Sequence, residues 1–104
     1  MKFIFEVHLH DGYTAQQYAD AWIRASKIIQ QAPGAAGTRL HRKIGEPGVL
    51  LAIATWESKQ ARDAMEARPV EQVQKIISEQ SKYCDIRIIG EFTDAEWQVD
   101  PPVT

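Results

Sequence analysis

Alternate residues of the apolar run at 49–56 combine two small side chains with one large aromatic ring: Ala52, Ala54 and Trp56. Residues two apart in a strand share one face of the sheet, so these three are expected to lie side by side. Small residues beside a large one leave a gap, which Trp22 and Met65 are expected to fill only in part. The pattern is compatible with an apolar pocket for a small molecule. The alternative is that Trp22 and Trp56 are ordinary core residues, as aromatic residues at such spacings usually are.

A second group with chemical potential lies near the N-terminus. His8 and His10 are two residues apart, and Glu6 precedes them by two. This spacing places all three on one face of a strand, where neutral imidazole and a carboxylate suit zinc or iron. A polar, hydrogen-bonded patch at a dimer interface or at the end of the strand is the other use of such a group.

The composition indicates one domain with a modest core. Of 104 residues 25% are charged, and the formal net charge of −2 comes from acidic and basic residues that are interleaved along the chain. This balance offers no basic surface for nucleic acid or a membrane. Residues 1–12 do not resemble a signal peptide, and no apolar run approaches the ~20 residues that a spanning helix needs. We therefore expect a soluble, cytoplasmic protein, in which the single cysteine, Cys84, is a buried structural thiol.

The first strand and helix follow from periodicity. Apolar residues at every second position from 2 to 10 predict a strand with one core face. Thr14 and Gln17 form a capping box, which opens an amphipathic helix of five turns that is predicted to reach Ala32. Pro33 and Gly34 end it.

A hairpin and a helical segment come next. Gly-Glu-Pro-Gly at 45–48 predicts a chain reversal between strands at 37–44 and 49–56. Ser58 is the predicted N-cap of the following helix, and Pro69 divides the helical region by starting a new segment. A last strand is predicted at 84–92, with Phe92 on the same face as Ile86 and Ile88.

The resulting order, β-α-β-β-α-β, predicts an α+β fold of ferredoxin-like type, with residues 1–92 as the domain and 93–104 as a C-terminal tail. Right-handed crossovers place both helical segments on one face of a four-stranded antiparallel sheet with strand order 4-1-3-2. The third strand then separates His41 from His8 and His10 by roughly 10 Å, two interstrand spacings. For this reason we predict no metal site.

The other face of this sheet carries Ile4, Glu6 and His8. It is too apolar for water and too polar for a dry core. We therefore expect a second copy of the chain to cover it, which predicts a homodimer.

The element order, the length, and the apolar strand that ends in Trp-Glu-Ser at 56–58 resemble the antibiotic biosynthesis monooxygenase family over residues 2–92. The resemblance implies a dimeric α+β barrel with a pocket between helices and sheet in each subunit. It also implies cofactor-independent oxidation of polyketides or quinols, or haem degradation, although many members have no known activity.

The family's site residues match this chain at one position. Polyketide-oxidising members carry an Asn four positions before the Trp of the motif and a Tyr six positions after it; here Trp56 is present, but Ala52 and Arg62 stand at the other two positions. Haem-degrading members carry an Asn, a Trp and an iron-ligating His where this chain has Val7, Met65 and Lys75. The resemblance therefore implies neither haem nor any other cofactor.

Two functional hypotheses follow. The first is a cofactor-independent monooxygenase that binds a small electron-rich aromatic, such as a quinol or anthrone, in the apolar pocket, where it is deprotonated and reduces oxygen. The second is a non-catalytic small-molecule-binding or structural dimer of the same fold. Arg62, Tyr18 and Lys75 are candidate bases by position only. The predicted substrate-binding residues are Trp56, Trp22, Ala52, Met65, Arg62 and Val7.

Overall fold

Strand β1 (Lys2–Leu9) lies inside the sheet because both of its edges are paired. In the computed structural model, which describes residues 1–103, β1 pairs antiparallel with β3 (Val49–Trp56) and with β4 (Cys84–Phe92), and β2 (Ala35–Arg42) pairs with β3. The strand order is β2-β3-β1-β4. Both the order and the antiparallel directions are those predicted from the sequence.

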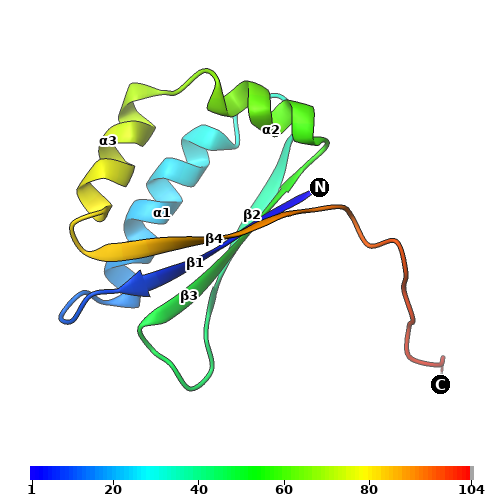
Figure 1. Cartoon of the computed structure of the whole chain (residues 1–104), viewed down its shortest axis with the longest axis horizontal. Helices are drawn as coiled ribbons and strands as arrows, with labels where there is room; N and C mark the ends of the chain where they lie inside the picture. Colours follow the sequence, from blue (N-terminus) through cyan, green and yellow to red (C-terminus); the bar gives the residue numbers. More distant parts are fainter. Residues whose placement is uncertain (104) are drawn as a thin grey trace.

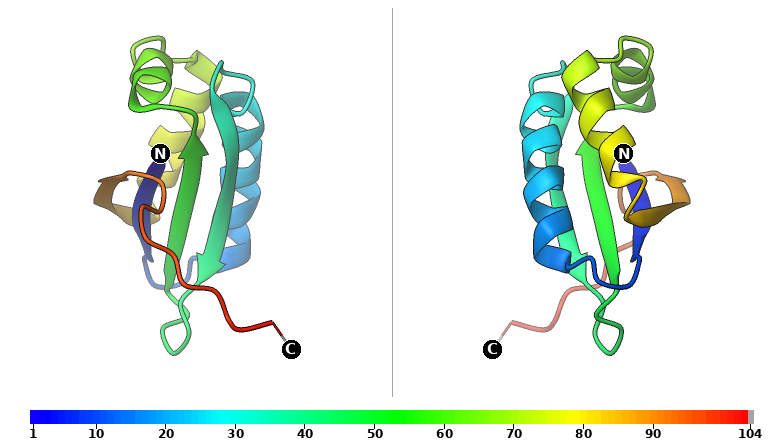
Figure 2. Two further views of the ribbon diagram at one scale, coloured as in Figure 1. Left: turned by 90° about the vertical axis from the view of Figure 1, so that its right-hand side faces the viewer. Right: turned by 90° about the vertical axis from the view of Figure 1, so that its left-hand side faces the viewer.

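Three helices cover one face of this sheet: α1 (Ala15–Ile29), α2 (Lys59–Glu66) and α3 (Glu71–Gln80). Figures 1 and 2 show the helices gathered on one side of the strands, while the C-terminal segment runs on the opposite side. Among the described residues, none of the helices has the length and apolar character needed to cross a bilayer.

The alternation along β1 assigns a face to every strand. Val7 is opposite Leu50 on β3, and these two side chains are the largest that are fully buried. With Ala15, Tyr18 and Cys84 they form the core between the sheet and the helices. The predicted core face of β1 is therefore confirmed.

One face assignment was wrong. Phe5 pairs with Ile88 whereas Ile4 pairs with Gly90, so β4 carries an extra residue between them. Such a bulge moves every later side chain to the opposite face. Phe92, which pairs with Lys2, therefore lies on the open face of the sheet, and not with Ile86 and Ile88 as predicted. Gly90, with φ of +148°, supplies the unusual backbone conformation.

The helix starts agree with the sequence, but α1 ends earlier than predicted. Thr14 and Gln17 form the capping box, and the Ser58 side chain caps α2 by accepting from the backbone N–H of Ala61. Helix α1 ends at Ile29, because the turn that follows tightens: the N–H of Ala32 donates to the carbonyl of Ile29. A helix cannot continue undisturbed into a proline, and this tighter turn precedes Pro33.

Two further boundaries differ slightly. Strand β2 lies two residues earlier than predicted, because the N–H of Glu46 donates to the carbonyl of Lys43 and so makes residues 43–46 part of the loop. Pro69 separates α2 from α3 as expected, but it precedes the N-cap Val70 and so lies just outside α3.

Residues 93–103 contain no helix or strand. Trp97, Val99 and Val103 are almost completely exposed there. The start of the segment is held near the N-terminus, where the amino group of Met1 lies 2.9 Å from the carboxylate of Asp94. Thr104, the last residue of the predicted tail, lies outside the described residues.

Candidate functional site

A cavity of about 1350 Å³ lies between the helices and the helix-covered face of the sheet. Its volume lies above the range of about 300–1,000 Å³ that is common for ligand pockets. Its walls come from all four strands on the sheet side, β2 through Thr38, and from all three helices on the other side. Aromatic rings form much of the wall: Phe3, Phe5, Tyr18, Trp22 and Trp56.

Four of the residues that the sequence suggested as ligand contacts line this cavity: Trp22, Trp56, Arg62 and Met65. They come from α1, the end of β3, and α2, which are far apart in the sequence. The fold therefore brings these four side chains to one space.

The other two suggested residues, Val7 and Ala52, are not among the lining residues, and both are 0% exposed. Ala52 is enclosed because it lies between Phe5 on β1 and Leu40 on β2. Val7 belongs to the closed core further along the sheet. Ala54, one step along the same face of β3, reaches the cavity instead.

Phe3 and Phe5 are wall residues that the sequence assigned only to the core face of β1. Their rings lie 5.9 Å apart. The pairing of β1 with β3 explains their place on the wall. Phe3 is opposite Ala54 and Phe5 is opposite Ala52, so each large ring faces a methyl group across the strands. Strand register, which the sequence did not supply, was needed to see it.

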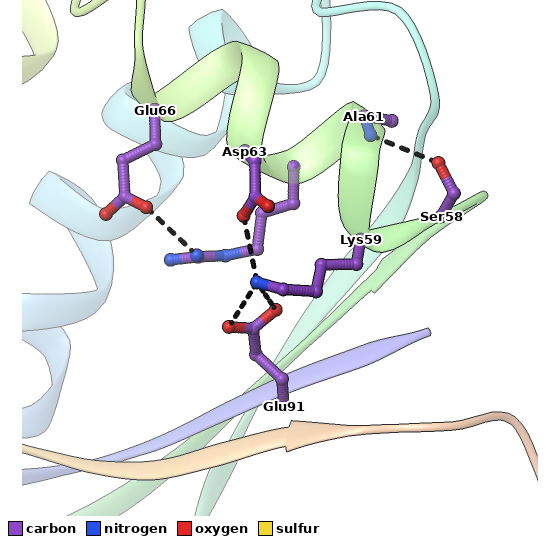
Figure 3. Close-up of polar contacts among 7 residues, drawn as sticks. Ser58, Lys59, Ala61, Asp63, Glu66 and Glu91 are labelled. Atoms are coloured by element: carbon purple, nitrogen blue, oxygen red, sulfur yellow. Dashed lines mark hydrogen bonds and ion pairs between the residues drawn. The ribbon is translucent and has the colours of Figure 1, made fainter.

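Helix α2 closes one end of the cavity and is held there on both sides. Towards the α1–β2 connection, a Cβ added to Gly34 would lie only 2.4 Å from the Cβ of Ala61, and Gly34 has φ of +85°. Only glycine satisfies both conditions. Towards β4, Lys59 Nζ lies 3.3 Å from the carboxylate of Glu91, and it also pairs with Asp63 one turn along α2, at 3.2 Å. Figure 3 shows both contacts.

Arg62 places a cation on the cavity wall. Its guanidinium carbon lies 3.6 Å from the centroid of the Phe3 ring, within the range of a cation–π contact. Its Nη1 donates to Glu66 Oε2 at 3.1 Å. The Arg62 side chain is only 11% exposed, whereas that of Glu66 is 65% exposed.

The two buried acids of the wall stay protonated at neutral pH. Burial raises the pKa of Tyr18 well above its ordinary value and also raises the pKa of the Cys84 thiol. The Cys84 thiol donates to the carbonyl of Gln80 at 3.3 Å. Tyr18 is therefore a neutral phenol, suited to donating a hydrogen bond and unsuited to accepting a proton.

The remaining candidate bases are also poorly suited. Lys75 is exposed and does not line the cavity. Arg62 remains a cation because a guanidinium is not deprotonated in proteins. The carboxylates on the wall, those of Glu57, Glu66 and Asp85, belong to exposed residues.

The histidines are dispersed over the sheet and its end. His8 Nε2 lies 3.4 Å from Glu6 on the open face, and His10 Nε2 lies 3.1 Å from Asp85 beyond the end of β1. His41 is on β2, two strands from β1. Within residues 1–103, no three histidine, cysteine or acidic side chains gather in a way that could hold a metal ion.

Comparison with known proteins gives structural matches alone. No family model matches the sequence, and no curated protein matches it. A variant of SnoaB, a cofactor-independent oxygenase from Streptomyces nogalater, has a TM-score of 0.79 at 20% identity, with 96% of each chain covered. A "putative antibiotic biosynthesis monooxygenase" from Deinococcus radiodurans has a TM-score of 0.75 at 14% identity, with 97% of this chain and 100% of the other covered.

A protein of the same description from Nitrosomonas europaea has a TM-score of 0.66 at 9% identity, with 89% of this chain and 100% of the other covered. This chain shares their fold. At such identities the likeness establishes the fold alone, because one fold serves many functions. The predicted ferredoxin-like α+β fold, and its resemblance to antibiotic biosynthesis monooxygenases, are confirmed at that level.

The placement of Ala52 and Ala54 predicts that the same substitution destabilises the fold at Ala52 and is tolerated at Ala54. Ala52→Leu should lower the free energy of unfolding by about 1–3 kcal/mol, because the added carbons enter a closed core. Ala54→Leu should change it by less than about 1 kcal/mol, because the cavity has room for them. Urea denaturation with unchanged slope measures both values. Equal losses for the two variants would mean that no space adjoins Ala54.

Tyr18 should make stability fall at alkaline pH. Because burial raises its pKa in the folded chain, the unfolded chain releases this proton at lower pH. The stabilisation is complete below the unfolded pKa of about 10 and is lost as pH rises from there towards the folded pKa. Tyr18→Phe should therefore flatten the decline in urea midpoint above about pH 10, leaving the parts due to Tyr13 and Cys84, whose pKa values burial also raises. An unchanged decline would show that Tyr18 ionises normally.

Proposed function

We propose that the protein is a cofactor-independent monooxygenase that binds a small electron-rich aromatic, quinol-like or polyketide-like, in the cavity between helices and sheet. The observation that carries this proposal is the cavity of about 1350 Å³ with its aromatic wall. Flat rings stack on aromatic side chains, and an apolar wall keeps water from reactive intermediates. The shared fold with SnoaB, a cofactor-independent oxygenase, supports the same reaction class.

The reaction balances without an external reductant. For an anthrone, a methylene group and O₂ become a carbonyl group and water. The substrate first loses a proton, and the resulting anion donates electrons to O₂. One oxygen atom then stays in the carbonyl, the other leaves as water with the two methylene hydrogens, and the substrate supplies all four electrons. The protein needs to orient the ring, favour its anion and exclude water.

Named side chains supply these functions. Trp22 provides a flat apolar contact for the ring system, Trp56, which is only 2% exposed, supports the wall from behind, and Met65 adapts to the outline of the ring. Tyr18, a neutral phenol on the wall, can donate a hydrogen bond to a substrate oxygen. Ala54, which is partly exposed and lines the cavity, sets how deeply the ring enters.

One observation favours the second candidate function, binding without catalysis. The buried titratable groups of the wall, Tyr18 and Cys84, both have raised pKa values, so neither is a base at neutral pH. A cavity without a buried base can hold a ligand and leave it unchanged. Oxygen consumption with aromatic substrates separates the two functions.

Oxygen consumption should rise above the uncatalysed rate when the protein is mixed with members of a panel of anthrones and quinols. With ¹⁸O₂ and an anthrone, the new carbonyl should carry one labelled atom. Ala54→Leu should reduce the rate by about tenfold or more, since added carbons in a fitted pocket have effects of that size. Ligand-induced stabilisation of the wild type without any oxygen uptake would favour binding alone.

We also propose that a second copy of the chain covers the open face of the sheet. Ile4, Leu51 and Ile53 lie on this face, opposite to the helices, and are only partly buried in the single chain. Glu6 and His8 share this face as a 3.4 Å pair. A sheet-on-sheet contact of this kind buries on the order of 1,000 Å² or more, the size of a stable interface.

Light scattering at micromolar concentration should give twice the 11.8 kDa mass of one chain. Ile53→Glu should lower the mass to that of one chain, because it places a charge in the middle of the open face. Ile23→Glu, on an exposed position of α1, should leave the mass unchanged. A wild type that runs as a single chain would refute the dimer.

A further inference from the structure

We infer that Arg62 is an anion-binding residue of the cavity, and that the ligand is therefore an aromatic molecule with an acidic oxygen, a carboxylate or an ionisable phenol or enol. The inference deepens the proposed function, since it rests on an aromatic ligand in this cavity.

Most of the hydrogen-bond donors of Arg62 have no acceptor in the described part of the chain. A guanidinium carries five N–H donors. Within residues 1–103, the single protein acceptor within hydrogen-bond distance of Arg62 is Glu66 Oε2, at 3.1 Å from Nη1. The Arg62 side chain is 11% exposed, and since no buried side-chain nitrogen or oxygen among the described residues lacks a partner, its unpaired nitrogens remain open to solvent. The remaining donors can serve a ligand.

Lys59, on the same helix, provides the contrast. Its side chain is 60% exposed, yet it lies within 3.3 Å of two carboxylates, those of Asp63 and Glu91. The exposed cation of α2 thus has two acidic partners, while the shielded one has a single partner that is itself mostly in solvent. An ion pair with a solvent-exposed carboxylate is weak. The pairing with Glu66 therefore orients Arg62 more than it neutralises it.

The guanidinium of Arg62 is held in place before any ligand arrives. One flat side rests on the Phe3 ring, with Cζ 3.6 Å from its centroid, and Nη1 is fixed by Glu66. The helix that carries it is capped by Ser58, whose Oγ accepts from Ala61 N at 3.1 Å, and is tied to β4 through Lys59 and Glu91 (Figure 3). A planar donor fixed in this way is suited to a carboxylate or to adjacent phenolic oxygens.

The wall around Arg62 strengthens its field. Phe3, Trp56 and Met65 line the same cavity, and apolar surroundings reduce the screening of a charge. A cation in such a place favours the anionic form of a bound acid and lowers its pKa. In the proposed reaction the anion is the species that reduces oxygen, so Arg62 would increase its population without itself accepting the proton.

The test uses a matched pair of ligands, anthracene-9-carboxylate and anthracene-9-carboxamide, which differ in charge and scarcely in shape. Binding is followed by quenching of tryptophan fluorescence, without turnover, at neutral pH and constant salt. The wild type should bind the carboxylate at least about tenfold more tightly than the amide, the effect expected of a charge-assisted hydrogen bond. Arg62→Gln should abolish this preference and leave the affinity for the amide nearly unchanged.

Two variants serve as controls. Glu66→Gln should keep or increase the preference, because it removes the competing carboxylate. Arg62→Lys should retain part of it, since the charge remains and the planar fork is lost. The comparison of the two ligands on the wild type needs no substitution, so it tests the charge preference even where a variant fails to fold. Equal affinity of the wild type for both ligands, or a preference that survives in Arg62→Gln, would overturn the inference.

The outcome is separable from that of the proposed function. A charge preference without oxygen uptake on any anthrone or quinol would leave the anion site intact and refute the oxygenase. Oxygen uptake without a charge preference would do the reverse. Failure of both aromatic probes to bind the wild type would refute the anion site.

Discussion

The antiparallel register between β1 and β3 is the constraint on which the interior depends. At one end it sets Val7 against Leu50, two branched side chains that together fill the space beneath the helices. At the other end it sets Phe3 against Ala54, so that a ring faces a single methyl group. The same alternation of apolar residues thus produces a closed core and an open cavity on one continuous face. A slip by one residue would exchange the two faces and remove both.

The cavity also depends on how α2 is held over its end of the sheet. Gly34 allows the helix to approach the α1–β2 connection more closely than any side chain would permit. The ion pairs of Lys59, to Asp63 on the same helix and to Glu91 on β4, lie on the exposed side of α2. Since solvent weakens such pairs, their effect is on position more than on stability. The apolar side of the helix is left to face the cavity with Arg62 and Met65.

Most of the fold could be predicted because its signals are local. The capping box at Thr14, the turn after β2 and the N-cap Ser58 each belong to a few consecutive residues. The bulge in β4 was missed because an extra residue becomes visible only against the partner strand, where Gly90 pairs with Ile4. Only part of the lining of the candidate site could be predicted, for a related reason. Periodicity gives the face on which Ala52 lies, but not that its neighbours on β1 and β2 enclose it.

The chemistry of the cavity follows from what burial does to each kind of group. Desolvation raises the pKa values of Tyr18 and Cys84, which keeps both neutral. An arginine remains charged under the same conditions, because its pKa lies too high for burial to neutralise it. On this apolar wall Tyr18 and Cys84 are therefore neutral donors, and Arg62 is a shielded cation. Such a wall stabilises negative charge on a bound molecule, and within residues 1–103 it holds no buried side chain that could act as a base. A proton that the ligand loses can pass to water or to the exposed carboxylates, among which Glu66 lies beside the cation.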